Sequence, residues 1–224
     1  MRRARFVHIS LGLLIALLVF LTGGRPSNAG PLSPHLQVGN TTCQNIVVNG
    51  DFEGDGGWRT YSAAGEELIS DFPPPSGAYH SGRRGAYLGD YNNAHDYITQ
   101  AITIPPNATQ VTLRYWWQVE SDEDPEATND RLTVTLDAVP GTPLVTLKEL
   151  TSRVQREVWE EESIPVEGYR GRTVWLRFDA RTDGSLPTAF FLDDVQVLVC
   201  QPDTSSPTWK LFIPRVFSGK GVGR

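Results

Sequence analysis

Segments in which apolar and polar residues alternate recur along this chain, and they limit its fold more than any other feature. Alternation with a period of two puts the apolar side chains on one face of a β-strand. Turns rich in Gly and Pro separate these segments, and no stretch has the period of a long helix. The expected strands lie at residues 45–50, 85–89, 95–104, 109–120, 131–137, 144–147, 158–166, 172–179 and 189–200. About ten short strands of this kind predict an all-β fold, an antiparallel β-sandwich of the jelly-roll type.

The last of these segments, residues 189–200, contains an acid within an apolar row. Its alternation places Asp193 on the same side as Phe191 and Val195, facing the core. An ionised carboxylate in a core needs a cation or several hydrogen-bond donors. We therefore expect Asp193 to belong to a metal site, and we expect Cys200 to tie this strand to a distant part of the chain.

The first 29 residues have the organisation of a secretory signal peptide. Three arginines within the first five residues precede an apolar run at 9–21, and small residues precede the expected cleavage site after Ala29. The apolar run is shorter than the roughly 20 residues that a membrane span needs. The alternative is that the segment stays uncleaved as an anchor. We expect a secreted bacterial protein, extracellular or at the cell surface, with no membrane span in the mature chain.

The rest of the chain is long enough for one domain with a full core. We expect residues 30–42 to form an irregular leader, 43–201 the jelly-roll domain, and 202–224 a linker and C-terminal tail. Removing residues 1–29 takes away four arginines and no acid, so the net charge of −6 becomes about −10. A chain this acidic does not bind nucleic acid or anionic lipid through a general field. Its charge suits cation binding, or simply solubility.

Two cysteines, Cys43 and Cys200, bracket almost the whole expected domain. Export to an oxidising compartment favours a disulfide between them. Such a bridge would place the first and last strands side by side, and chain entropy predicts about 5 kcal/mol of stabilisation for so long a loop. The alternative is a pair of free buried thiols.

Residues 51–58, just after the first expected strand, combine acids and glycines with two aromatic residues. Glycines free backbone carbonyls to point at an ion, and oxygen ligands of this kind suit calcium. This segment belongs to an ordered series of short motifs: Val48-Asn-Gly-Asp-Phe-Glu53, Trp58, Ser81-Gly82, Ala86-Tyr-Leu-Gly89, Asp96 with Gln100 and Pro105, Leu113-x-Tyr-Trp-Trp117, Asp130-x-Leu-x-Val134 and Leu192-Asp-Asp-Val195. Together these motifs resemble the galactose-binding-like jelly-roll modules of secreted bacterial proteins. The similar groups are calcium-containing carbohydrate-binding modules and MAM-like accessory domains of secreted peptidases, and the resemblance covers residues 43–200.

This resemblance implies a structural calcium ion. In such modules the ion is held by the Glu of the first motif, the first Asp of the last motif and loop carbonyls. The corresponding metal set here is Glu53, Asp193 and Asp51, with a further carbonyl near Ser81. The alternative is that Glu53 and Asp193 bond to arginine or to backbone donors. Asp194 alternates to the outside of its strand and is expected at the surface.

Sugar binding needs exposed flat aromatic rings flanked by hydrogen-bonding groups. Successive strands of a jelly roll alternate between two sheets, so the outer face of one sheet is expected to carry Tyr97, Thr133, Thr135, Trp175 and Arg177, and that of the other Arg114, Trp116 and Gln118. Trp175 with Tyr97, flanked by Arg177, is the first candidate platform, and Trp116 is the second. The alternative for each ring is packing beneath a covering loop. Trp58, Trp117 and Trp159 are expected in the core or against loops.

The acidic segment 120–126 allows two functional interpretations, and we favour neither. One is a second cation site, although a solvated loop is the simpler interpretation. The other is a glycosidase carboxylate pair, because Glu120-x-Asp122 begins the pattern Glu-x-Asp-x-x-Glu, but Pro125 stands where the second Glu is required. The sequence also lacks Gly-x-Ser-x-Gly, His-Glu-x-x-His and a free catalytic cysteine. We therefore expect no catalytic residues, and we interpret His80 as structural.

The sequence thus predicts a secreted, non-catalytic binding module with a structural calcium, whose ligand is a glycan or another cell-surface polymer. The alternative is a protein-interaction or adhesion module without a sugar site. A third hypothesis is a hydrolase with an unrecognised carboxylate pair. Because fold does not fix function, the side chains on the outer faces of the two sheets have to distinguish these hypotheses.

Overall fold

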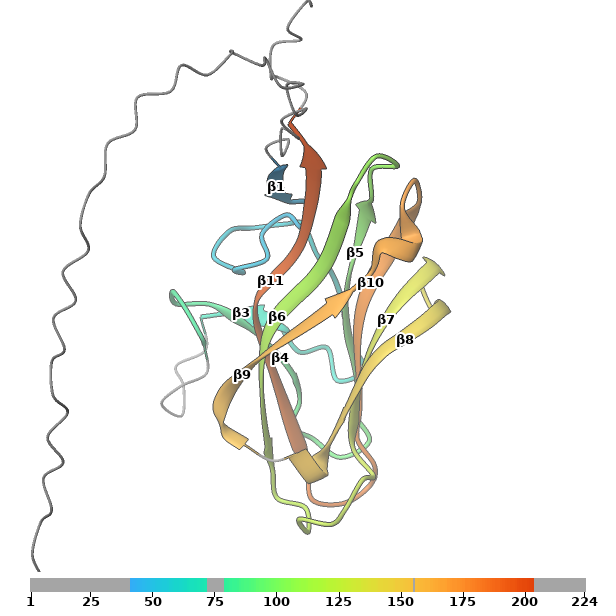
Figure 1. Cartoon of the computed structure of the whole chain (residues 1–224). Helices are drawn as coiled ribbons and strands as arrows, with labels where there is room; N and C mark the ends of the chain where they lie inside the picture. The colour runs from blue at the N-terminus through green and yellow to red at the C-terminus, as the bar shows by residue number, and fades with distance from the viewer. Residues whose placement is uncertain (1–40, 72–78, 155, 204–224) are drawn as a thin grey trace, which may run out of the picture. The chain divides into compact units, whose positions relative to one another are not determined.

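The computed structural model describes residues 41–71, 79–154 and 156–203 (Figure 1). The expected signal peptide, most of the expected leader and almost all of the expected C-terminal tail lie outside the described residues. Within those residues, no helix is long and apolar enough to cross a membrane.

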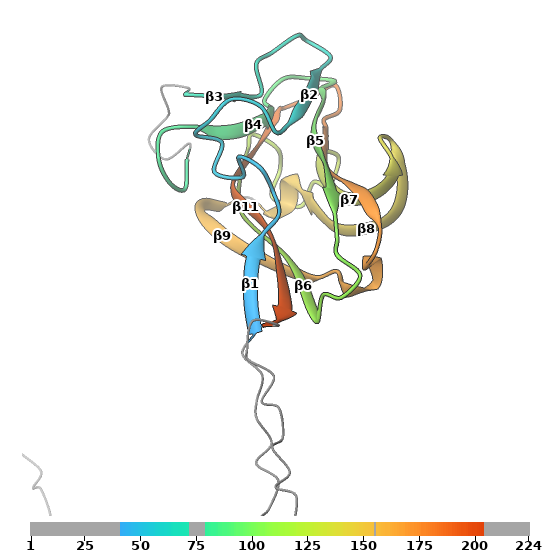
Figure 2. The same ribbon diagram turned by 90° about the horizontal axis from the view of Figure 1, so that it is seen from above.

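Two antiparallel sheets face each other and form a β-sandwich (Figures 1 and 2). One sheet has the order β3-β4-β11-β6-β9, with β1 also paired to β11; its strands are β1 (Thr41–Asn45), β3 (Ile69–Ser70), β4 (Gly85–Gly89), β6 (Gln110–Ser121), β9 (Arg156–Pro165) and β11 (Thr188–Pro202). The other has the order β2-β5-β10-β7-β8; its strands are β2 (Arg59–Ser62), β5 (His95–Thr103), β7 (Arg131–Val139), β8 (Thr142–Thr151) and β10 (Thr173–Arg181). From β4 onward, successive strands alternate between the sheets except at the β7–β8 hairpin, which confirms the predicted sandwich.

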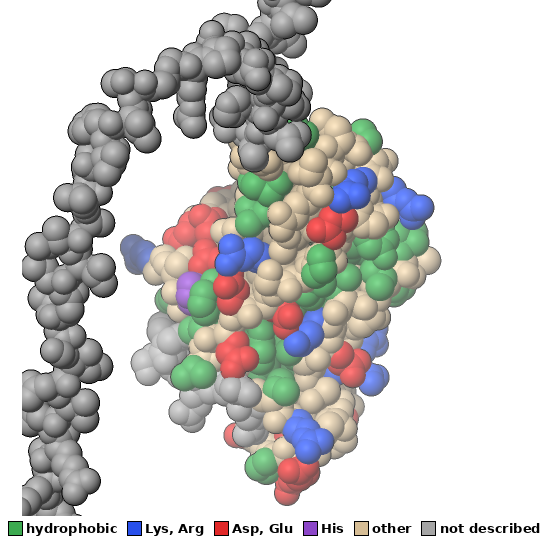
Figure 3. Space-filling model, in the orientation of Figure 1, with side chains coloured by type: hydrophobic (Ala, Val, Ile, Leu, Met, Phe, Trp, Pro, Cys, Tyr) green, Lys and Arg blue, Asp and Glu red, His purple; other side chains and the backbone are tan. Residues whose placement is uncertain are grey.

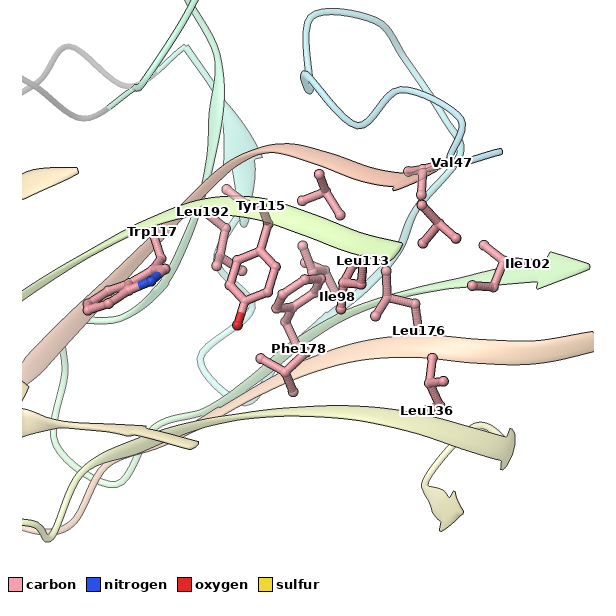
Figure 4. Packing of buried hydrophobic residues seen from close by; sticks show 14 of the residues in the cluster. Val47, Ile98, Ile102, Leu113, Tyr115, Trp117, Leu136, Leu176, Phe178 and Leu192 are labelled. Atoms are coloured by element: carbon pink, nitrogen blue, oxygen red, sulfur yellow. The ribbon is translucent and has the colours of Figure 1, made fainter. Parts of the chain in front are cut away.

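The core forms between the inner faces of the two sheets, where alternate residues of each strand meet. In β6 the inward side chains are Val111, Leu113, Tyr115, Trp117 and Val119, each almost fully buried. The Tyr115 ring packs edge-on against Phe178 of β10, with 5.2 Å between the ring centroids (Figure 4). Tyr115 is thus a core aromatic residue, and its burial raises the pKa of its phenol. The alternating pattern of the sequence thus correctly predicts which side chains of β6 face the core.

Three local features differ from the sequence expectation. The first strand is Thr41–Asn45 rather than residues 45–50. The strands β2 and β3 were not expected, because segments of four and two residues are too short to show an alternating pattern. Trp58 and Trp117 pack in or against the core, as expected.

The third difference lies in β11 and corrects the predicted orientation of Asp193. The register between β11 and β6 shifts between Asp193 and Gln196, at a β-bulge where Asp194 has a φ of 48°. Phe190 and Leu192 face the core before the bulge, and Val195 faces it afterwards. The prediction that Phe191 and Asp193 share the core-facing row with Val195 is therefore wrong, because the bulge exchanges the two faces of the strand.

The predicted disulfide between Cys43 and Cys200 is present, with the two Cα atoms 4.0 Å apart. The two residues stand opposite each other in the β1–β11 pair. Every residue of β1 is exposed, so this strand contributes little buried surface of its own. The covalent bond therefore holds an edge strand that packing alone would hold weakly.

We expect reduction of this disulfide to lower the free energy of unfolding by about 2–5 kcal/mol, because the bond restricts the unfolded chain. Urea denaturation with and without a thiol reductant measures this change. A variant with Cys43→Ser and Cys200→Ser is the control, and its unfolding should not respond to reductant. Equal midpoints for the oxidised and reduced parent would contradict a stabilising role for the bond.

Candidate functional site

The outer face of the five-stranded sheet carries the side chains predicted for the first candidate platform. Tyr97 of β5 stands opposite Asp179 of β10, which in turn stands opposite Thr133 of β7. Directly opposed residues of antiparallel strands share a face, so these three side chains point the same way. Arg177 lies in the next outward row with Thr135, and Trp175 lies in the row beyond it. The predicted shared face of Tyr97, Thr133, Thr135, Trp175 and Arg177 is confirmed.

Tyr97 is the centre of an aromatic and cationic stack. The Tyr61 ring of β2 stacks on it, with centroids 5.1 Å apart and an interplanar angle of 19°. The Arg177 guanidinium carbon lies 3.6 Å from the Tyr97 ring centroid, within the range of a cation–π contact. Tyr61 is 45% exposed and presents this stack to solvent. Sequence reasoning missed Tyr61 because it did not recognise β2.

An ion-pair network fixes the polar side chains beside this stack. Arg177 is buried and forms an ion pair with Asp179. Asp179 also accepts a hydrogen bond from Nε of Arg181 at 3.0 Å, and its other oxygen lies 3.5 Å from Nε2 of His95. Arg177 is thus held on two sides and supports Tyr97 from within, whereas Arg181 remains exposed at the surface.

Trp175 borders a shallow depression on the same face. Its ring is half-buried, and the Arg59 guanidinium carbon lies 4.6 Å from the ring centroid. The depression has a volume of about 250 Å³ and is lined by Val48, Gly57, Arg59, Thr99, Gln100, Ala101 and Trp175. Gln100 holds one wall in place, because its amide both accepts from the Val48 N–H (2.8 Å) and donates to the Val48 carbonyl (2.9 Å). Four residues of β10 separate the rows of Trp175 and Tyr97, which corresponds to about 13 Å along the strand.

The outer face of the six-stranded sheet, the second candidate platform, is covered. The His80 ring stacks on Trp116 with centroids 3.8 Å apart and nearly parallel planes, and Trp159 packs edge-on against His80. The His80 Nδ1 atom lies 2.6 Å from Oδ2 of Asp194. Asp194 is accordingly half-buried beneath His80 rather than free at the surface. Trp116 therefore packs beneath a loop, which is the alternative considered for it.

Several charged side chains elsewhere on the molecule form ion pairs. Arg114 pairs with Glu161, and Nζ of Lys148 lies 2.6 Å from Oε2 of Glu162. In the view of Figure 3, Lys and Arg side chains are interspersed with Asp and Glu over the visible face. The acidic excess of the chain thus forms no broad negative surface on that face.

The loop 80–84 connects two acids of the predicted calcium site. Asp193 is fully buried, and its Oδ2 accepts hydrogen bonds from the backbone N–H groups of His80 and Ser81, both at 2.9 Å. Glu53 Oε1 accepts from the N–H groups of Arg83 (2.6 Å) and Arg84 (2.8 Å). One loop therefore donates hydrogen bonds to both carboxylates. This agrees with the alternative that Glu53 and Asp193 bond to backbone donors.

The two carboxylates differ in their electrostatics. Burial raises the pKa of the Asp193 carboxyl to about 7, while hydrogen bonds from backbone N–H groups act in the opposite direction. The N–H groups of Arg83 and Arg84 lower the pKa of the Glu53 carboxyl. A nearby cation would favour the ionised form of Asp193 and so offset its desolvation.

The remaining oxygen atoms of these carboxylates accept few hydrogen bonds from the protein. Within the described residues, Glu53 Oε2 has no hydrogen bond from the protein, and Asp193 Oδ1 accepts only the N–H of Asp194 (2.7 Å). Asp51 is exposed, and its Oδ1 lies 3.5 Å from the Glu53 N–H. The structure thus joins Glu53 and Asp193 through one loop, and it leaves Asp51 at the surface beside Glu53.

A third group of acids lies elsewhere and could hold a metal ion. One oxygen each from Glu123, Asp130 and Asp183 lies within 4.8 Å of the other two. Glu123 belongs to the acidic segment that was interpreted as a solvated loop, but its side chain is buried. The solvated-loop interpretation is wrong for Glu123, because the fold buries this side chain near Asp183, a residue distant in the sequence.

No family model and no curated protein matches the chain. Among solved structures, it is similar to a carbohydrate-binding module, TmCBM61 in complex with β-1,4-galactotriose, with 14% identity over 71% of this chain and 99% of that chain and a TM-score of 0.48. It is also similar to an adhesin domain of Lys-gingipain from Porphyromonas gingivalis (16% identity, 71% of this chain, 98% of that chain, TM-score 0.45). A Stig cyclase, Fisc from Fischerella, is a further match (15% identity, 72% of this chain, 99% of that chain, TM-score 0.45). At these values the likeness concerns the fold alone.

The contact between the loop 80–84 and Glu53 predicts how substitution of Gly82 affects stability. This residue has a φ of +63°, and a Cβ added to it would lie 2.2 Å from Glu53 Oε1. Gly65 has a φ of +78° with open space around it, so it is a matched control. We expect Gly65→Ala to cost about 1–2 kcal/mol for the left-handed backbone alone. We expect Gly82→Ala to cost roughly 1 kcal/mol more, because Glu53 must move off its donors. Urea denaturation of both variants measures the difference, and equal losses would contradict the described contact.

Proposed function

We propose that the protein is a secreted, non-catalytic binding module that recognises a glycan or a related cell-surface polymer on the outer face of its five-stranded sheet. The observation that carries this proposal is the set of aromatic rings on that face, Tyr61, Tyr97 and Trp175, interleaved with hydrogen-bonding side chains. The disulfide fits an oxidising compartment outside the cytosol.

The chemistry of this face suits a sugar. The apolar faces of pyranose rings stack on flat aromatic side chains, and their hydroxyl groups take hydrogen bonds from the surrounding polar groups. Arg59 and Arg181 are exposed on this face and offer donors, and the half-exposed Thr133 of β7 adds a hydroxyl group. A site that combines rings with charged and hydroxyl groups favours a polar, ring-containing ligand over a purely apolar one.

The spacing of the rings favours an extended ligand. About 13 Å of strand separates the Tyr97 row from the Trp175 row, which exceeds the size of one sugar ring. Between the two rows lies Arg177, which is already held by Asp179 and by the Tyr97 ring. A ligand that contacts both rows must therefore be an oligomer or polymer, and the fixed side chains reduce the entropy lost when it binds.

The structural calcium expected from the resemblance belongs to the region of Glu53 and Asp193. There a calcium ion would supply positive charge to a fully buried carboxylate and bind hard oxygen ligands. Glu53 and Asp193 would hold the ion, and the loop 80–84 would stay attached to β11 through Asp193 and to the segment before β2 through Glu53. In this role the ion supports the sandwich and takes no part in ligand binding.

We expect Trp175→Ala and Tyr97→Ala each to weaken glycan binding at least tenfold, or about 1.4 kcal/mol, because the first removes a ring and the second removes the support on which the exposed Tyr61 ring stacks. A glycan array with the full chain identifies the ligand, and titration calorimetry measures the affinities. Trp116→Ala is the control, because it removes the same side chain from the covered face. Binding of no glycan by the folded parent would reject the glycan proposal in favour of a protein-interaction or adhesion module.

We also expect calcium to raise the melting temperature of the parent, because an ion that binds the folded state stabilises it by about 2.7 kcal/mol at 100 times its Kd. In Glu53→Gln the amide oxygen can still accept from the loop, but the ligand charge is lost. The calcium-dependent rise should therefore be smaller in this variant than in the parent. Scanning calorimetry with added calcium or a chelator gives both values, and an identical rise in parent and variant would remove Glu53 from the metal set.

A further inference from the structure

Three acids from two connections meet at one end of the sandwich. Glu123 lies in the connection between β6 and β7, Asp130 directly precedes β7, and Asp183 lies in the connection between β10 and β11. Both connections lie at the lower end of the domain in Figure 1, away from β1. β6 and β11 belong to one sheet, and β7 and β10 belong to the other. Anything bound by all three acids would therefore link the two sheets.

Asp130 is the residue that points to a ligand. It is fully buried, and its Oδ1 accepts a hydrogen bond from the Asp183 backbone N–H at 2.7 Å. Its Oδ2 is buried and has no hydrogen-bond partner within the described residues. A buried carboxylate oxygen without a partner is costly unless a cation or donor meets it.

The surroundings of Asp130 increase that cost. One oxygen each of Glu123 and Asp183 lies within 4.8 Å of an Asp130 oxygen, and like charges at this distance repel. Within the described part of the chain, no Lys or Arg forms an ion pair with Asp130 or Asp183. The Asp130 carboxylate therefore lies in a cluster of acids and has no basic side chain paired with it in the described residues.

The backbone around the cluster is held independently of any ligand. The Asp122 N–H donates to the Pro187 carbonyl at 3.2 Å, and the Ser152 N–H donates to the Asp130 carbonyl at 3.1 Å. Asp183 Oδ1 accepts from both the N–H and the hydroxyl of Ser185, at 2.9 Å each. The folded chain thus positions the Asp130 and Asp183 carboxylates and the backbone on either side of them, so an ion would bind a site that is largely built.

The donor atoms define the class of ion. All three side chains offer carboxylate oxygens, and none offers the nitrogen or sulfur that zinc and copper prefer. Calcium takes six to eight oxygen ligands in flexible geometry and accepts several carboxylates, whereas magnesium keeps most of its waters. We propose that Glu123, Asp130 and Asp183 form a second calcium site, which joins the β6–β7 and β10–β11 connections. This site shares no residue with the Glu53–Asp193 region.

Calcium titration by calorimetry, with the calcium-free full chain, tests the proposal. The expected result is that Asp130→Asn binds one calcium ion fewer per chain than the parent, while Glu53→Gln retains that ion. Asp122→Asn is the matched control, because it removes the same charge from an exposed side chain of the same loop. An unchanged calcium stoichiometry in Asp130→Asn would overturn the proposal. So would saturation of the site by magnesium at the same concentration as calcium.

Thermal unfolding gives a second, independent readout. With a chelator present, Asp130→Asn should melt at or above the temperature of the parent, because it removes a buried, repelled charge. With saturating calcium the order should reverse. If Asp130→Asn melts above the parent in both conditions, the carboxylates share a proton instead of a cation and the proposal fails. Should Asp130→Asn not fold, Asp183→Asn serves in its place, since the amide oxygen can still accept from Ser185.

Discussion

The pairing of β11 with its neighbours is the interaction on which the rest of the sandwich depends. This strand pairs with β6 along one edge and with both β1 and β4 along the other. Its bulge between Asp193 and Gln196 decides which side chains enter the core and which lie beneath the loop 80–84. A strand without the bulge would put either Leu192 or Val195 outside, because one residue of slip exchanges the faces. The bulge therefore sets both the core and the position of the buried Asp193 carboxylate.

The period-two pattern made most of the fold predictable. Long strands such as β6 and β10 carry enough alternating residues to fix both their type and their faces, which is why the positions of Tyr97 and Trp175 followed from the sequence. The bulge could not be predicted, because Asp193 and Asp194 fit the alternation equally well with or without it. β2 was not predicted because it is too short to show a pattern, and Tyr61 was therefore missed as well. The acid cluster could not be predicted because Glu123 and Asp183 are brought together by tertiary structure alone.

Buried carboxylates have a common role in this protein, which the net charge does not reveal. Asp96 accepts from the Gly89 N–H (2.9 Å) and the Tyr91 hydroxyl (2.7 Å), and Asp137 accepts from the Gly141 N–H (2.8 Å). Asp193 does the same for the loop 80–84. In each case an acid in or beside a strand satisfies donors from a loop. These buried acids are thus used to attach loops to the sheets, and Asp130 stands apart because one of its oxygens is not used in this way.

The antiparallel pairing of Thr41 with Pro202 brings the chain into the domain and out of it at the same place. The disulfide lies two residues inside this pair on each strand, so any mechanical tension applied between the two flanking segments passes from Cys43 to Cys200 through the covalent bond. The chain between the two cysteines, which are 157 residues apart and enclose nearly the whole sandwich, is then not stretched by this tension. A domain pulled by its two flanking segments would keep its sandwich folded under that force for as long as this one bond stays oxidised.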